Sequence, residues 1–123
     1  MAAPVDMELR KAFQELQVKM IDTTRRLRMA DMQIESLKNG IQAAYLTGEA
    51  LSETPADTKM YESVGRMFLA TTSIDVKKNL DEKIKTHSEK IKNLETNKAY
   101  LERNLKEAEN NLREMIVQKQ NMH

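Results

Sequence analysis

Histidine is the side chain best suited to proton transfer or metal binding near neutral pH, and this sequence of 123 residues contains two of them. The chain has no cysteine, so neither His87 nor His123 can share a metal with a thiolate. His87 occupies a core position of a heptad repeat, which favours an imidazole packed between helices, and His123 is the last residue. We therefore expect neither a metal site nor a catalytic histidine.

The other polar residues also lack the pattern of a reactive site. Carboxylates such as Glu107 and Glu109 lie in a run of alternating charges, which is typical of a solvated helix surface. The sequence contains no glycine-rich phosphate loop and no order of serine, histidine and aspartate that suggests a nucleophile. These features predict a protein that is not an enzyme and that uses no cofactor.

Basic residues gather at one place, Arg25, Arg26 and Arg28. The basic helix of a leucine-zipper DNA-binding protein lies outside its heptads, whereas Leu27 here lies at a heptad core position. The 20 basic and 19 acidic residues give a net charge of +1, which attracts neither nucleic acid nor an anionic membrane. We expect neither as a partner, and the lack of a signal segment or apolar span predicts a cytoplasmic protein.

The first half of the chain also carries a thin second row of apolar residues, Val18, Ile21, Met29 and Met32. They fall on the outer face of the predicted first helix. Single apolar residues scattered on a surface and a contact with another subunit explain this row equally well.

Two long helices are predicted to position these residues. A charged fraction of 32% with 4% aromatic residues is typical of extended helices rather than of an ordinary compact core. Apolar residues recur at alternating spacings of four and three, the heptad pattern of a coiled coil. The first run is Leu9, Phe13, Leu16, Met20, Thr23, Leu27, Ala30, Ile34, Leu37, Ile41 and Ala44; the second is Leu80, Ile84, His87, Ile91, Leu94, Lys98, Leu101, Leu105, Ala108, Leu112 and Met115.

Capping signals divide the chain, which we expect to form one domain over residues 1–123. Gly48 is placed to end the first helix, so residues 1–46 are assigned to it. Thr72 and Asp75 have the form of a capping box, which starts the second helix near Ser73 and assigns residues 73–123 to it. Residues 47–72 are left as a linker and a β-hairpin.

The hairpin is predicted over Met60–Thr71, where the heptad pattern stops and Gly65 marks a turn. An isolated two-stranded hairpin is marginal in water, and its edges can pair with further strands. We therefore predict assembly with other hairpins into a β-barrel body. The residues assigned to this assembly hairpin are Met60, Tyr61, Val64, Gly65, Arg66, Met67 and Phe68.

The two helices are expected to pack as an antiparallel coiled coil. If Ile41 faces Leu80 in the first layer, Thr23 faces Lys98 and the two form a polar layer that sets the register. In this register the end of the second helix extends past the start of the first, which leaves apolar residues without a partner. The predicted binding tip consists of Val5, Met7, Leu9, Phe13, Met115, Ile116 and Met122.

Several segments together resemble the prefoldin family, specifically its β-class subunits. They are Ala12-Phe13-Gln14-Glu15-Leu16-Gln17, Asp31-Met32-Gln33-Ile34-Glu35, Met60-Tyr61-Glu62-Ser63-Val64-Gly65-Arg66-Met67-Phe68 and Tyr100-Leu101-Glu102-Arg103. The resemblance implies a hexamer of two α-class and four β-class subunits with coiled coils that project from a β-barrel body. It also implies ATP-independent capture of unfolded actin and tubulin at the coiled-coil tips, followed by transfer to the cytosolic chaperonin. A structural coiled-coil scaffold without client binding is the alternative.

Overall fold

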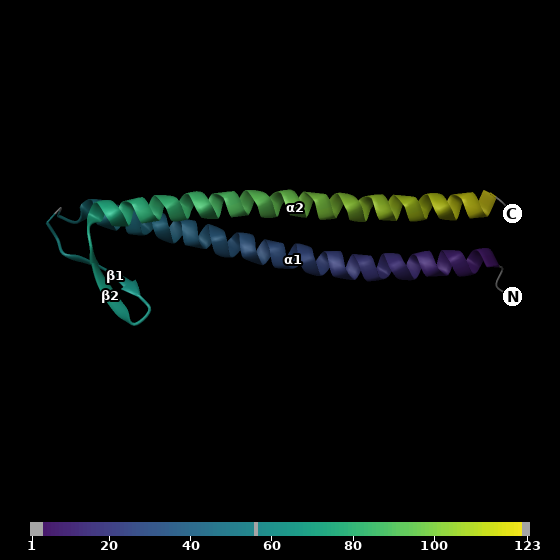
Figure 1. The fold of residues 1–123 in the computed structure, drawn as a ribbon. Coiled ribbons are helices and arrows are strands. Elements are labelled where there is room, and N and C mark those ends of the chain that lie inside the picture. The colour runs from purple at the N-terminus through teal and green to yellow at the C-terminus, as the bar shows by residue number, and fades with distance from the viewer. Residues whose placement is uncertain (1–3, 56, 122–123) are drawn as a thin grey trace. The chain divides into compact units, whose positions relative to one another are not determined.

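The computed structural model describes residues 4–55 and 57–121, and the side chains of residues 4–6 lie outside this description. The elements are helix α1 (Pro4–Glu53), strands β1 (Met60–Val64) and β2 (Met67–Thr71), and helix α2 (Ser73–Asn121), in that order (Figure 1). Two long helices joined through a two-stranded antiparallel hairpin are the predicted fold class, which is confirmed.

Helix α1 is longer than predicted, because it continues through Gly48 to Glu53. The hydroxyl group of Thr54 donates a hydrogen bond to the Ala50 carbonyl at 2.8 Å, so it bonds to the last turn of the helix instead of forming a separate turn. The helix ends just before Pro55, which disfavours helical geometry at the residue that precedes it. The predicted end at Gly48 is therefore wrong.

The two strands form a tight hairpin. Met60 pairs with Thr71 at its open end and Val64 pairs with Met67 beside the turn. Gly65 has a φ of 62°, and no residue other than glycine has a positive φ in the described chain. A positive φ at the first of the two turn residues, Gly65, but not at the second, Arg66, is the pattern of a type II′ turn. Glycine adopts this geometry without a steric penalty. The predicted hairpin and the place of Gly65 in its turn are confirmed.

Helix α2 begins at Ser73, as the capping pattern predicts. The backbone N–H of Asp75 donates to Thr72 Oγ1 at 3.2 Å, which satisfies one of the free N–H groups in the first turn. The Asp75 carboxylate also lies in this first turn, where a negative charge is favoured by the helix dipole.

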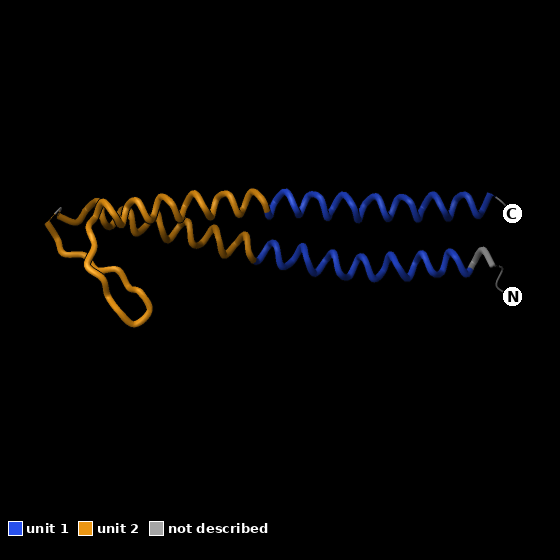
Figure 2. The backbone as a smooth tube through the Cα atoms, viewed as in Figure 1, with its two compact units in different colours: residues 1–32, 94–123 blue, residues 33–93 orange. Residues whose placement is uncertain are grey.

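The chain forms two compact units, one of residues 1–32 and 94–123 and the other of residues 33–93 (Figure 2). In each unit a segment of α1 lies beside a segment of α2, and we call the row of facing side chains the seam. Seam positions predicted from the heptads are buried or half-buried, apart from Phe13, Met20 and Met115. The buried described residues are Thr23, Ala30, Ile34, Ala44 and Leu112.

The seam pairs residues about one heptad away from the predicted register. In the first unit, Lys119 Nζ lies 2.7 Å from Glu8 Oε2. In the second unit, Gly40 packs against His87, because a β-carbon at Gly40 would lie 3.1 Å from Cδ2 and Nε2 of the imidazole. A heptad pattern is unchanged by a shift of seven residues, so apolar residues still face apolar residues in the observed register.

The predicted polar layer of Thr23 and Lys98 is wrong for the same reason. The Lys98 ammonium forms an ion pair with Asp31, which lies about 12 Å further along α1 than Thr23 at 1.5 Å per residue. The hydrogen bond to Asp31 is the main cause that raises the pKa of Lys98. Thr23 is instead buried in the seam, with 5% of its surface exposed.

Candidate functional site

The hairpin exposes apolar side chains on both of its faces. Side chains alternate along a strand, so the register places Val64, Met67 and Leu69 on one face and Tyr61 and Phe68 on the other. Phe68 is 72% exposed and Tyr61 is 61% exposed. Phe68 therefore lies on the other face of the hairpin from Val64 and Met67.

These two apolar faces are accompanied by two unpaired strand edges. The sheet consists of β1 and β2 alone within the described residues. The outer edge of each strand therefore presents backbone N–H and C=O groups that can pair with another strand. All residues of the predicted assembly set are exposed except Met60, which is half-buried beside the start of the hairpin. A surface with this combination of free edges and exposed apolar side chains is suited to association with other β-strands.

The second candidate surface is the free end of the helix pair, which we define as residues 4–16 of α1 and 112–121 of α2. Of the predicted tip residues, Met7 is 68% exposed, Phe13 and Met115 are also exposed, and Leu9 and Ile116 are half-buried. Val5 lies in α1 with its side chain outside the description, and Met122 lies outside the described residues.

An ion pair joins the two helices at this free end. Glu8 Oε2 accepts a hydrogen bond from Lys119 Nζ at 2.7 Å. This hydrogen bond, followed by the charge of Lys119, holds the pKa of the Glu8 carboxyl below its usual range. The pairing shows that the last turns of α2 lie beside the first turns of α1, so the predicted overhang of α2 is wrong.

A groove next to this ion pair supplies an apolar floor. It has a volume of about 250 Å³, and Leu16 of α1 together with Leu112 and Met115 of α2 contributes to its lining. Glu15 and Lys19 stand along the same groove. Apolar side chains with charged neighbours can hold a flexible, partly apolar polypeptide without a fixed geometry.

Sequence reasoning missed three contributors to the free end. Val117, which is 54% exposed, was left out of the predicted tip, although its apolar side chain in a polar segment is a visible signal. Glu8 and Lys119 were missed because their pairing depends on the register. Once α1 and α2 are aligned by their observed contacts, opposite charges at these two positions follow directly.

The described part of the chain lacks the features of a metal site or a membrane span. No group of three or more histidine or acidic side chains there is arranged to hold a metal ion. Neither α1 nor α2 contains a described stretch that is apolar over the length needed to span a membrane. His87 packs against Gly40, and its Nδ1 atom is buried without a hydrogen-bond partner among the described residues.

Comparisons with known proteins point to one family. A family model described as prefoldin subunit matches residues 14–119. Prefoldin subunit 1 of Homo sapiens is 49% identical over 89 residues, which covers 72% of this chain and 73% of the relative. Prefoldin subunit 1 of Danio rerio is 48% identical over 86 residues, 70% of each chain, and that of Arabidopsis thaliana is 34% identical over 80 residues, 65% of this chain and 62% of the relative.

A solved structure shares the fold. The crystal structure of the prefoldin beta subunit from Thermococcus strain KS-1 superposes with a TM-score of 0.70 and covers 87% of this chain and 90% of that chain. The sequence identity is 20%, so this likeness concerns the arrangement of the helices and the hairpin.

Proposed function

The chain belongs to the prefoldin family, and from this premise we propose that it is a β-class subunit of a heterohexameric co-chaperone with two α-class and four β-class subunits. The observation that carries the assembly role is the hairpin, with apolar side chains on both faces and two unpaired edges. Burial of these groups between other hairpins, in a β-barrel body, stabilises the complex and removes the free edges. The single hairpin among the described residues and the fold shared with the prefoldin beta subunit from Thermococcus strain KS-1 support the β class.

The free end of the helix pair is the proposed binding site for unfolded proteins. Met7, Phe13 and Val117 expose apolar surface there, and Met115 extends it into the groove between the helices. Weak contacts of this kind from several subunits combine through their high effective concentration. Unfolded actin and tubulin are the proposed clients, and the cytosolic chaperonin is the proposed recipient in the cytoplasm. We propose that capture is independent of ATP, as membership of the prefoldin family implies.

Aggregation of a diluted client tests this function. Chemically unfolded actin is diluted into buffer with the assembled hexamer, and light scattering is followed with time. We expect the wild-type complex to suppress scattering without ATP. A complex that assembles but never suppresses scattering would favour the scaffold alternative.

Two matched triple variants locate the binding site. The tip variant carries Met7→Ser, Phe13→Ser and Val117→Ser, while the control variant removes similar exposed surface elsewhere through Tyr45→Ser, Leu46→Ser and Tyr100→Ser. We expect the tip variant to lose suppression partially, because the other subunits still contribute, and to release clients faster. Its hexamer mass should be unchanged. Equal loss in both variants would place the binding site away from the free end.

A further inference from the structure

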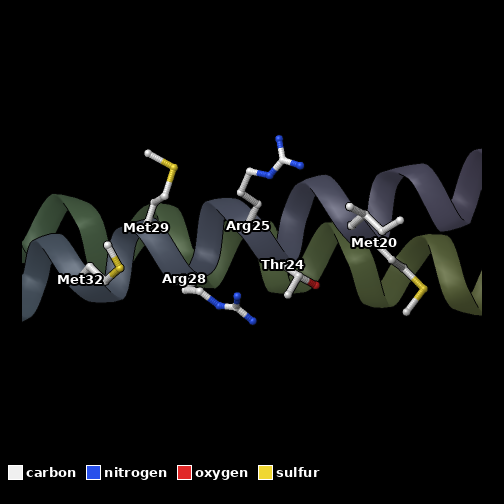
Figure 3. Close-up of a pocket in the computed structure, with 7 residues that line it drawn as sticks. Met20, Thr24, Arg25, Arg28, Met29 and Met32 are labelled. Carbon is white, nitrogen blue, oxygen red and sulfur yellow. The ribbon is translucent and has the colours of Figure 1, made fainter.

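A stripe of exposed apolar and basic residues lies on α1, on the side of the helix opposite the seam. We call it the Met/Arg stripe and define it as Val18, Ile21, Arg25, Arg28, Met29 and Met32. Val18, Ile21, Arg25, Arg28 and Met32 recur at spacings of three and four, and Met29 lies four positions after Arg25, so all six share one helix face. Thr23 and Ala30 face α2. Ile21 and Met32 are each more than 60% exposed, and this face borders a shallow groove of about 600 Å³ (Figure 3).

The two arginines of the stripe carry charge that the chain itself does not neutralise. Asp22 and Asp31 are the acidic residues within one helical turn, at three positions before Arg25 and three positions after Arg28. Asp22 Oδ2 pairs with Arg26 Nε at 3.1 Å, and Asp31 pairs with Lys98 of α2. Arg25 and Arg28 therefore have no ion-pair partner among the described residues.

The arrangement of these groups specifies what could cover them. In Figure 3 the side chains of Arg25 and Met29 point to one side of the helix and that of Arg28 points to the other, so the two guanidinium groups lie on opposite sides of the stripe. Arginine binds carboxylates through two parallel hydrogen bonds, and methionine adapts to varied apolar surfaces. Arginine and methionine are also enriched at protein interfaces.

We propose that the Met/Arg stripe is a docking site for an acidic amphipathic α-helix of a partner protein. The apolar face of that helix packs on Ile21, Met29 and Met32, and carboxylates at its two flanks bind Arg25 and Arg28. The stripe runs over residues 18–32, which is about 22 Å at 1.5 Å per residue and accommodates about four turns of a partner helix. Because its residues belong neither to the hairpin nor to the segments defined as the free end, this inference does not rest on the proposed function.

A helix is a better occupant than a membrane or a second copy of this chain. Spacings of three and four on one helix match the ridges of another helix, whereas a lipid surface requires no such spacing. Two unpaired basic residues also provide little attraction for anionic lipid. In a symmetric dimer the same patch would meet itself and bring arginine close to arginine.

Fluorescence anisotropy with a synthetic peptide tests the proposal on the full-length chain. The probe is a labelled 18-residue helical peptide with leucines at spacings of three and four and glutamates at both flanks. A second peptide has lysine at every glutamate position. We expect the glutamate peptide to bind the wild-type chain, and the Arg25→Glu, Arg28→Glu double variant to weaken that binding by roughly tenfold or more.

Charge exchange and a control variant make the result specific. The lysine peptide should bind the Arg25→Glu, Arg28→Glu variant more tightly than it binds the wild type. Arg103→Glu with Lys106→Glu makes the same charge change at the same spacing on the exposed surface of α2, and it should leave binding of the glutamate peptide unchanged. Circular dichroism verifies that each variant is folded.

Five results would overturn the proposal. The first three are the absence of binding by the glutamate peptide, equal affinity of the two peptides for the wild type, and an equal loss of binding in the Arg103→Glu, Lys106→Glu control. The fourth is a wild-type dimer, detected by sedimentation velocity, that Met29→Glu dissociates, which would assign the stripe to a second copy. Binding of phosphatidylserine vesicles that depends on Arg25 and Arg28, without binding of the peptide, would assign it to a membrane.

Discussion

At the scale of single residues, small side chains on α1 face large ones on α2. Gly40 packs against the imidazole of His87, and Ala44 and Gly48 line the same groove as Leu80 and Ile84 of α2. The two glycines have different surroundings, however. A β-carbon at Gly40 would meet His87 at 3.1 Å, whereas a β-carbon at Gly48 would have no neighbour within 4 Å.

This difference predicts unequal responses to the same substitution. Gly48→Ala should raise the free energy of unfolding by about 0.5–1 kcal/mol, because alanine is favoured over glycine inside a helix and open space is present for its methyl group. Gly40→Ala should give less stabilisation or a loss, since the imidazole must move. Urea unfolding followed by circular dichroism measures both. Adding His87→Ala to Gly40→Ala should remove the steric part, and equal effects of the two glycine variants would contradict the packing.

The contact between Lys98 and Asp31 predicts energetic coupling between these two residues. Asp31→Asn and Lys98→Met should be non-additive in a double-mutant cycle, and the coupling should decrease as salt is added. Thr23→Val and Lys98→Met should be additive, because Thr23 lies about 12 Å from the position of Asp31 along α1. Thermal unfolding of the single and double variants provides the measurement. Coupling of Lys98 with Thr23 in place of Asp31 would restore the register predicted from the sequence.

At the scale of elements, the sequence predicts which elements form more reliably than how they are aligned. The heptads identify both helices, Thr72 and Asp75 mark the start of α2, and Gly65 marks the turn, because each signal is local. Alignment of α1 with α2 depends on a long connection. Because Gly48 was predicted to end α1, the predicted helix is too short and the predicted linker is too long. In addition, a heptad pattern looks the same after a shift of seven residues, so it cannot fix the register.

The candidate surfaces follow the same division. The hairpin residues were predictable, since a short apolar segment between two heptad runs is visible in the sequence. The division of its apolar side chains between two faces depends on strand pairing, which places Phe68 opposite Ser63 and Val64 opposite Met67. At the free end, Met7 and Phe13 were predictable as apolar residues outside the best-packed layers, but the pairing of Glu8 with Lys119 required the register.

That ion pair links the alignment of the helices to pH. Lys119 holds the pKa of Glu8 below its usual range, so the stabilisation is present above the unfolded-state pKa and is lost as pH falls through the folded-state pKa. Glu8→Gln should therefore lower the unfolding temperature slightly at pH 7, and the difference from wild type should disappear in strong acid. Thermal unfolding over a pH series measures it. In a Lys119→Met background the difference should be absent, and a difference that grows towards acid would contradict the pairing.

At the scale of the whole molecule, the chain exposes much more surface than a compact protein of its mass. Its accessible surface is 10158 Å², whereas a compact monomer of 14.2 kDa exposes roughly 6,800 Å² by the usual scaling with mass. Exposed apolar side chains on the hairpin, on the Met/Arg stripe and at the free end contribute to this excess. These exposed apolar side chains are therefore available for burial against other chains.

Assembly should accordingly depend on the hairpin. Phe68→Asp should leave the helical circular dichroism nearly unchanged, because Phe68 is exposed in the single chain, but it should prevent incorporation into the proposed hexamer. An unpaired charge buried in an interface costs several kcal/mol. Co-purification with partner subunits and the mass of the complex measure assembly. Thr58→Asp adds the same charge outside the strands and should assemble normally, and normal assembly of Phe68→Asp would exclude this face of the hairpin from the interface.

The thinness of the seam determines how the helix pair can open. Its buried described residues are Thr23, Ala30, Ile34, Ala44 and Leu112, so no aromatic cluster ties distant layers together. Each layer is held mainly by its immediate neighbours, and separation can begin at one end while the remaining layers stay closed. Leu112 is the last buried residue of α2 among those described, and beyond it Lys119 forms an ion pair with Glu8 of α1. The ends of α1 and α2 can therefore separate locally, by different amounts, to accommodate bound segments of different width.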